Sequence, residues 1–314
     1  MTVEHSRPTV TSHQRTPPAT FAVPAAGRLL HLGSRPWLMG VVNASPESFS
    51  DGRQVGDLDS QFARARQLTE DGADIIDVGG ESAVTNRPAL SAAEEIDRVV
   101  PLVERIVDRL GTLVSIDTYK PEVAQAAIAA GAVLVNDVSG LRDPALADVC
   151  ARTGAALVIM HTRAAPKTRL QDPALYEDIT TDVVGFLTDR MRLAIGAGVP
   201  ADALILDPGA DFTKTPRQTV DLLRGLANLH ALGRPLLLAV SRKDFIGALT
   251  GRTPSQRLAG TLAAIGHCAD VGAHLMRVHD VAAARDYLTV RAALRGELPV
   301  DPALTLSETL RYER

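Results

Sequence analysis

Residues 234–247 read RPLLLAVSRKDFIG, a short apolar run that ends abruptly in Ser241, Arg242, Lys243 and Asp244. An apolar run without strict polar alternation is typical of a parallel strand that is covered on both faces. Charge at the end of a buried strand is costly unless the side chains face water or a ligand. The stretch therefore predicts a buried strand with polar chemistry at its C-terminal end.

The same pattern recurs along the chain at a regular interval. Short runs rich in Val, Ile and Leu occupy residues 37–43, 74–80, 113–117, 133–137, 156–161, 203–207, 235–241 and 274–280. Longer segments of helical composition separate them. Ser91 followed by Glu94 predicts a capping box, and Gly131, Gly154 and Gly272 are expected to end helices in the left-handed conformation.

Eight strand-then-helix units predict an α/β protein with a single (β/α)8 TIM barrel. The alternative, a doubly wound open sheet, seldom needs eight repeats, and no G-x-G-x-x-G fingerprint follows the first strand. We expect the barrel over residues 31–298 and a C-terminal extension over 299–314. Residues 1–30, rich in Pro, Thr and Ser without a hydrophobic period, are expected to form a disordered tail rather than an export signal.

Composition and charge exclude several classes of protein. The 314 residues carry a formal net charge of −4, which argues against a nucleic-acid partner. No apolar run approaches the roughly 20 residues of a membrane span, so we expect no membrane partner. Cys150 and Cys268 are too few and too far apart for a disulfide framework, so we expect two buried thiols and a cytoplasmic location.

The active site of such a barrel lies at the C-terminal ends of its strands. Each predicted strand ends in polar residues, which are Asn43, Glu81, Asp117, Asn136 with Asp137, His161, Asp207, the group at 241–243, and Arg277 with His279. Any one of the Asp or Asn residues could simply cap a helix, but all eight ends together indicate a site.

These strand-end residues differ in the chemistry they offer. Asp117, Asn136 and Asp207 suit the polar edge of a planar heterocycle. Lys243, Arg277 and His279 follow strands seven and eight, where barrels commonly hold a phosphate. Asn43 could reach the same anion or Mg²⁺.

At these residues the sequence resembles dihydropteroate synthases, from about Trp37 to Ala292. The ordered motifs are MGVVNASPESFSDG (39–52), DVGGES (77–82), SIDTYKPEVA (115–124), NDVSGL (136–141), MH (160–161), DPG (207–209), SRKDFIG (241–247) and RVHDV (277–281). The resemblance implies a transferase of folate biosynthesis that condenses 6-hydroxymethyl-7,8-dihydropterin diphosphate with p-aminobenzoate. It also implies a homodimer.

The resemblance further implies the role of each site residue. It places Asp117, Asn136, Asp207 and Lys243 on the pterin, and Asn43, Arg277 and His279 on the diphosphate, with Mg²⁺ bound at Asn43. It implies Ser50 and Asp51 in a catalytic loop. On the p-aminobenzoate side it implies Arg87, Phe212, Ser241 and Asp244.

Three departures from the family pattern fall on the p-aminobenzoate side. The second loop reads ESAVTNRPAL, with Arg87 and Pro88 displaced by three residues; Asp211 replaces a glycine; and Asp244 follows Lys243 where Ser or a basic residue is usual. The two aspartates could repel an anionic substrate. Alternatively, they turn outward or pair with Lys214 and Arg87.

The departures leave two other functions to weigh against an active synthase. One is a diverged paralogue that binds pterin diphosphate but has lost or changed its use of p-aminobenzoate. The other is the pterin-binding barrel of a methyltransferase, which would not require the Ser-Arg-Lys and Arg-Val-His-Asp motifs. We expect the synthase.

Overall fold

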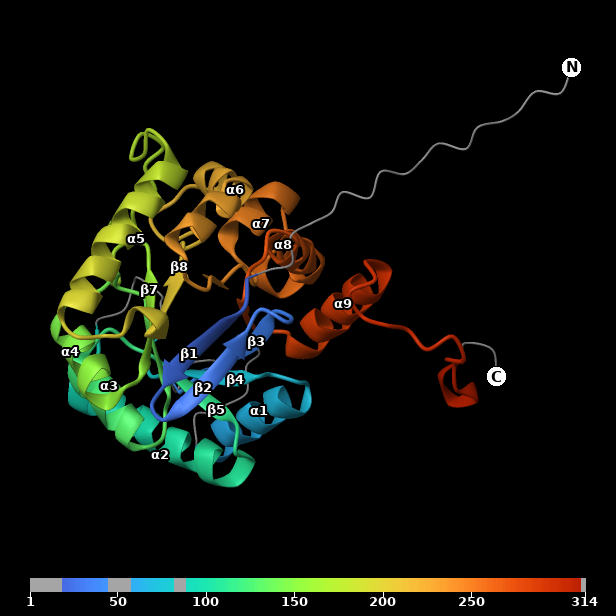
Figure 1. Ribbon diagram of the computed structural model, residues 1–314, viewed down its shortest axis with the longest axis horizontal. Coiled ribbons are helices and arrows are strands. Elements are labelled where there is room, and N and C mark those ends of the chain that lie inside the picture. Colours follow the sequence, from blue (N-terminus) through green and yellow to red (C-terminus); the bar gives the residue numbers. More distant parts are fainter. Residues whose placement is uncertain (1–18, 45–57, 82–88, 312–314) are drawn as a thin grey trace, which may run out of the picture.

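The computed structural model describes residues 19–44, 58–81 and 89–311 of the chain, and it shows the predicted TIM barrel (Figure 1). Eight parallel strands follow one another in the order β8-β7-β6-β5-β4-β3-β10-β9. Their bounds are β3 Trp37–Asn43, β4 Ile75–Gly79, β5 Leu113–Asp117, β6 Leu134–Asp137, β7 Ala156–Met160, β8 Leu204–Asp207, β9 Leu237–Leu238 and β10 Leu275–Val278.

The two edge strands of this order meet and close the barrel. Leu206 and Leu236 form a parallel bridge, and the Leu206 amide donates to the Pro235 carbonyl at 2.9 Å. The register pairs Asp117 with both Gly79 and Asn136 on the neighbouring strands. The strand ends on the C-terminal side therefore lie at one common rim, as the sequence predicted.

Helices surround the sheet on its outer face, as Figure 1 shows. The Ser91–Glu94 capping box is present at the start of α2, and Gly131, Gly154 and Gly272 have φ values of 108°, 70° and 89°. The helices are α1 Leu58–Glu70, α2 Ala92–Leu110, α3 Pro121–Ala129, α4 Ala145–Thr153, α5 Ile179–Gly196, α6 Pro216–Arg224, α7 Asp244–Thr250, α8 Leu258–Asp270 and α9 Val281–Leu294. Cys150 and Cys268 are free and buried among them, as expected.

The prediction of a disordered tail over residues 1–30 is wrong for residues 21–30. An antiparallel hairpin, β1 Phe21–Ala25 and β2 Arg28–Leu32, packs across the N-terminal end of the barrel. Its inward residues alternate along each strand, and Val23 and Leu30 are buried against Met39 and Ile75. This period-2 pattern is the signature of a strand with one face buried, which the Pro-rich composition concealed. Residues 1–18 lie outside the described part of the chain.

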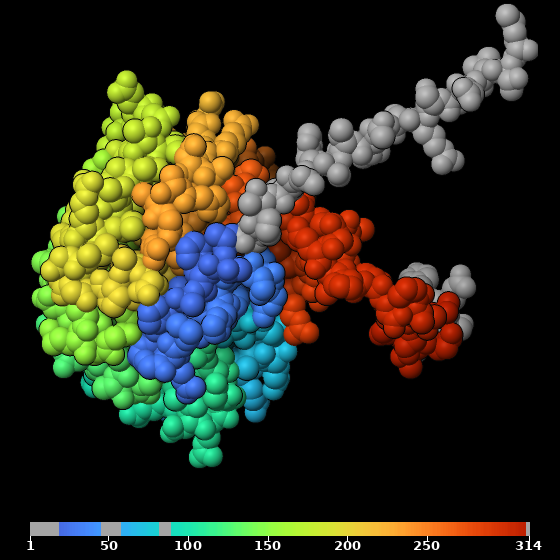
Figure 2. Space-filling view, in the orientation of Figure 1, coloured from blue at the N-terminus to red at the C-terminus, as the bar shows by residue number. Residues whose placement is uncertain are grey.

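The C-terminal end of the chain projects away from the barrel beyond α9 (Figure 2). Residues 299–311 are exposed throughout, including Leu304 and Leu310. Among the residues described, no helix combines the length and apolar composition needed to span a membrane.

Candidate active site

One guanidinium links β10 to the two adjacent strands β4 and β5. Arg277 on β10 donates from Nε to Asp77 Oδ2 at 2.6 Å and from Nη2 to Asp117 Oδ2 at 2.7 Å. Burial alone would lower the pKa of Arg277, but the two carboxylates outweigh it and raise the pKa above its usual value. Arg277 is thus a fixed cation at the centre of the site.

Asp77 and Asp117 share the single positive charge of Arg277, so the cost of burying the negative charge of Asp117 is only partly offset. Burial raises the pKa of Asp117 to about 7, Arg277 opposes the shift, and Asp77 adds to it. Asp117 can therefore change protonation near neutral pH, which suits a group that exchanges a proton or hydrogen bond with a ligand.

Asp77 is the residue that sequence reasoning missed. It is fully buried in the middle of β4, where its Oδ2 also accepts from Asn136 Nδ2 at 3.1 Å. Among the residues that the structure describes, neither its other oxygen, Oδ1, nor the buried Ser115 hydroxyl on the neighbouring strand has a hydrogen-bond partner. A lone carboxylate inside an otherwise apolar strand, IIDVG, was the available signal, because a buried acid requires a cation.

Asp207 and Lys243 approach this centre from β8 and from the start of α7. Asp207 is buried and accepts from the Gly209 amide at 2.7 Å; burial raises its pKa, and Lys243 and Arg277 oppose the shift. Burial likewise lowers the pKa of Lys243, and Asp211 and Asp207 counteract it. These couplings place the expected pterin residues Asp117, Asn136, Asp207 and Lys243 in one electrostatic cluster around Arg277.

His279 adjoins the cluster and is held by Ser241. The Ser241 hydroxyl lies 3.0 Å from His279 Nδ1 and accepts from the His279 amide at 3.2 Å. Burial, together with Arg277 and Arg242, lowers the pKa of His279 to about 4, so the ring is neutral at pH 7. The hydroxyl has two acceptor sites as well as one donor, so it can donate to Nδ1 or accept from it, according to the tautomer of the ring.

The neighbourhood of His279 contains further residues expected from the sequence and one that was not. Asn43 is the exposed last residue of β3, paired in register with Gly79. Arg64 of α1 donates to the His279 carbonyl at 2.7 Å and adds a cation that the sequence did not indicate. Arg242 forms a bidentate pair with Asp280.

On the expected p-aminobenzoate side, Lys243 Nζ lies 4.3 Å from the centroid of the Phe212 ring. Ser241, assigned to this side from the sequence, instead contacts His279 through its hydroxyl. Arg87, Ser50 and Asp51 lie outside the described residues.

The two departing aspartates find partners other than those considered. Asp244 turns outward, with 70% of its side chain exposed, and pairs with Arg257 at 2.9 Å. Asp211 accepts hydrogen bonds from Thr219 and from the Phe245 amide. The outward turn of Asp244 is one of the alternatives that the sequence left open, whereas a pair with Arg87, which lies outside the described residues, stays a prediction.

Other polar strand ends serve the scaffold. Asp137 accepts from the amides of Ser139 and Leu141 in the turn that follows β6; it does not cap α4, which begins at Ala145 after the N-cap residue Pro144. Glu81 pairs with Lys120 at 2.7 Å and Lys167 at 3.1 Å.

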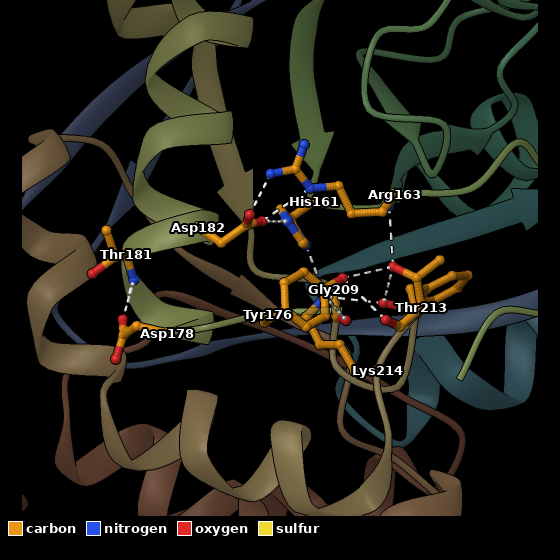
Figure 3. Close-up of polar contacts among 10 residues, drawn as sticks. His161, Arg163, Tyr176, Asp178, Thr181, Asp182, Gly209, Thr213 and Lys214 are labelled. Atoms are coloured by element: carbon orange, nitrogen blue, oxygen red, sulfur yellow. Dashed lines mark hydrogen bonds and ion pairs between the residues drawn. The ribbon is translucent and has the colours of Figure 1, made fainter. Parts of the chain in front are cut away.

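His161 joins a buried chain of contacts that Figure 3 shows. Its Nε2 lies 2.9 Å from Asp182 Oδ1, and Lys214 Nζ lies 2.8 Å from its Nδ1. Lys214 is fully buried and donates also to the carbonyls of Gly209 and Phe212 at 2.9 and 3.0 Å. Burial lowers the pKa of His161 to about 3, and Lys214 adds to the shift, so this ring is a neutral bridge. The chain of contacts fixes the loop after β8.

Within residues 19–44, 58–81 and 89–311, no group of three or more His, Cys, Asp or Glu side chains could hold a metal. Mg²⁺ commonly takes only one or two protein ligands and completes its shell with substrate phosphates and water. The amide oxygen of Asn43 fits that limited role.

A closed barrel with buried Asp, Asn and Lys side chains at its rim defines the class of pterin-binding barrel enzymes, and the family model described as "Pterin binding enzyme" matches residues 39–279. The dihydropteroate synthase of Escherichia coli K12 is 37% identical over 289 residues, 92% of this chain and 99% of that protein. The Xanthomonas albilineans dihydropteroate synthase solved with 4-aminobenzoic acid is 42% identical, with a TM-score of 0.81 over 88% of this chain and 100% of that one. The same enzyme solved with 7,8-dihydropteroate is 41% identical, with a TM-score of 0.78 over 88% and 100%.

The chain belongs to the dihydropteroate synthase family, and it is a transferase of that type in folate biosynthesis. The relatives support the synthase over the diverged paralogue and the methyltransferase barrel.

Proposed function

We propose that the residues around Arg277 bind 6-hydroxymethyl-7,8-dihydropterin diphosphate and that p-aminobenzoate attacks it beside Phe212. The observation that carries this assignment is the Asp77–Arg277–Asp117 array, in which Asn136 donates a hydrogen bond to Asp77. Such an array offers carboxylate acceptors and an amide to a heterocycle that carries an amino group and ring N–H donors. The relatives solved with 4-aminobenzoic acid and 7,8-dihydropteroate support the same substrates here.

The pterin ring would be recognised by Asp117, Asn136, Asp207 and Lys243. Asp117 and Asp207 are acids whose pKa burial raises, so a donor from the ring would satisfy them in the ionised form. Asp77 Oδ1 lacks a partner among the described residues, which supports a ligand or a water molecule as its hydrogen-bond donor.

The diphosphate would meet donors from β3 and β10. In the tautomer that carries its proton on Nε2, the neutral His279 ring would donate a hydrogen bond without adding charge. Arg277 supplies positive charge, and Asn43 supplies an amide oxygen or a donor. Bound Mg²⁺ would neutralise part of the charge that develops on the leaving pyrophosphate.

The reaction forms a bond between the p-aminobenzoate nitrogen and the pterin methylene carbon. The bond from that carbon to the diphosphate oxygen breaks, pyrophosphate leaves with the electron pair, and the amine releases one proton. The Phe212 ring and the stem of Lys243 would form the wall against which the p-aminobenzoate ring packs. Donors placed where negative charge develops are the expected source of catalysis.

The test is to incubate the purified protein with pterin diphosphate, Mg²⁺ and p-aminobenzoate and to measure dihydropteroate and pyrophosphate together. Equal amounts of both products are expected. Asp207→Asn is expected to weaken pterin binding, whereas Arg217→Met, on the exposed side of α6, is the matched control. Pyrophosphate without dihydropteroate would contradict the proposed use of p-aminobenzoate.

Several expectations remain predictions. They are Mg²⁺ dependence, a homodimer, a cytoplasmic location and a separate C-terminal extension from residue 299. Chelation followed by Mg²⁺ titration tests the first, and light scattering on the full chain tests the second.

A further inference from the structure

Asp211 occupies a backbone conformation that L residues seldom adopt. Its φ is 66°, in the left-handed region where glycine is at ease and Asp or Asn is tolerated better than most other residues. The dihydropteroate synthase pattern has glycine at this position. A non-glycine residue in this conformation costs backbone strain energy. The contacts of the Asp211 carboxylate are the interactions that can offset that strain.

The carboxylate of Asp211 connects two elements that follow different strands. Thr219 Oγ1 of α6 accepts from the Asp211 amide at 3.2 Å and donates to Asp211 Oδ1 at 3.0 Å. The Phe245 amide, at the start of α7, donates to Asp211 Oδ2 at 3.2 Å. Thr219 is fully buried, so this closed set of contacts is anchored to the core.

The two segments joined in this way carry Phe212 and Lys243. Phe212 directly follows Asp211, and Lys243 precedes Phe245 by two residues. Lys243 Nζ lies 4.3 Å from the Phe212 ring centroid, and Lys214 Nζ donates a hydrogen bond to the Phe212 carbonyl at 3.0 Å. The separation of the ring and the ammonium therefore depends on how firmly Asp211 holds the two segments together.

We propose that Asp211 is a positioning residue that fixes the Phe212–Lys243 wall for the aromatic ring of p-aminobenzoate. This inference rests on the proposed function. Both carboxylate oxygens of Asp211 are engaged by donors of the protein, so they are not directed at the substrate carboxylate. The departure from glycine thus tightens the p-aminobenzoate site instead of repelling its ligand.

Two variants separate positioning from charge. Asp211→Gly removes the carboxylate and relieves the backbone, whereas Thr219→Val removes the anchoring hydroxyl and keeps the negative charge. Asp189→Asn is the matched control, because it removes a carboxylate that is 74% exposed on α5 and is assigned to neither substrate. For each variant, the KM for p-aminobenzoate, kcat, and the Kd for pterin diphosphate alone are measured.

Asp211→Gly is expected to raise the KM for p-aminobenzoate about three- to tenfold, with a smaller rise for Thr219→Val. The pterin diphosphate Kd should rise by a smaller factor than this KM in both variants, because Lys243 is one of four residues assigned to the pterin, and Asp189→Asn should leave KM and Kd within about twofold. A lower KM in Asp211→Gly, an unchanged KM, or an equal loss of pterin affinity would overturn the proposal.

Hydrogen exchange over residues 241–250 distinguishes this proposal from the proposed function. Asp211→Gly and Thr219→Val should speed exchange at the Phe245 amide, which Asp211 protects in the wild type. If exchange at this amide is unchanged, the positioning role of Asp211 is overturned even if the enzyme is active. A wild type that binds pterin diphosphate but forms no dihydropteroate overturns the proposed function and the assigned substrate, whatever the exchange shows.

Discussion

Arg277 and Asp117 form an ion pair at 2.7 Å between β10 and β5, and the same guanidinium holds the buried Asp77 at 2.6 Å. The sequence assigned Arg277 to the diphosphate and Asp117 to the pterin. The ion pair shows that the two expected subsites share one charge network. A substitution in one is therefore expected to affect ligands of both.

Replacing Arg277 with Met should destabilise the protein by about 3–5 kcal/mol, because it leaves the fully buried Asp77 without its cation. Urea unfolding at pH 7 measures the loss. Arg242→Met is the matched control, since its partner Asp280 is partly exposed and the expected cost is about 1 kcal/mol or less. The double variant Arg277→Met with Asp77→Asn should recover part of the loss; no recovery would contradict a charge-based cause.

Asp117 should make stability depend on pH below neutrality. Its pKa is raised from 3.8 to about 7, so the folded chain binds more protons than the unfolded chain between these values. The contribution of Asp117 to the free energy of unfolding is present at low pH and is lost as the pH rises toward 7. The loss is at most about 1.4 kcal/mol per pH unit. Asp117→Asn should flatten the dependence, measured by urea unfolding from about pH 4.5 to 8. Parallel curves for both proteins would refute the assignment.

Lys214 should stabilise the fold as a buried hydrogen-bond donor. It is fully buried and donates to His161, Gly209 and Phe212, so Lys214→Met leaves three acceptors without a donor. We expect a loss of about 1–3 kcal/mol in the free energy of unfolding. Arg217→Met, whose side chain is 80% exposed, should stay within about 0.5 kcal/mol.

The same lysine should also leave a signature above pH 7. Burial lowers its pKa to about 7 from 10.5, so the unfolded chain binds more protons between these values. The wild type should gain stability through Lys214 as the pH rises from about 7 to 10, and Lys214→Met should lack that gain. An equal gain in the variant would show that other groups are responsible.

Asp244→Ser should leave the KM for p-aminobenzoate within about twofold of the wild type. If Asp244 faced the p-aminobenzoate pocket, relief of like-charge repulsion would instead lower this KM about fivefold. The structure removes the reason for that gain, because Asp244 faces solvent and Arg257. Steady-state kinetics at two salt concentrations measure the effect. A KM several-fold lower than that of the wild type at low salt, with a smaller difference at high salt, would show that Asp244 does repel the substrate.

The sequence by itself determined the barrel and much of its rim. Apolar runs, capping residues and helix-ending glycines are local signals, because each depends on backbone conformation and burial over a few residues. The alternation of eight strands with helices then placed Asp117, Asn136, Asp207 and Arg277 at one rim, where the structure has them.

Only the tertiary structure decided which side chains pair. Asp77 and Arg277 are 200 residues apart, and Ser241 reaches His279 across 38 residues, so no local pattern could report either contact. The outward turn of Asp244 and the anchoring of Asp211 likewise depend on α6, α7 and Arg257. Local sequence sets the position of each residue along its strand, whereas the partner of a charge is selected by the packing of distant segments around it.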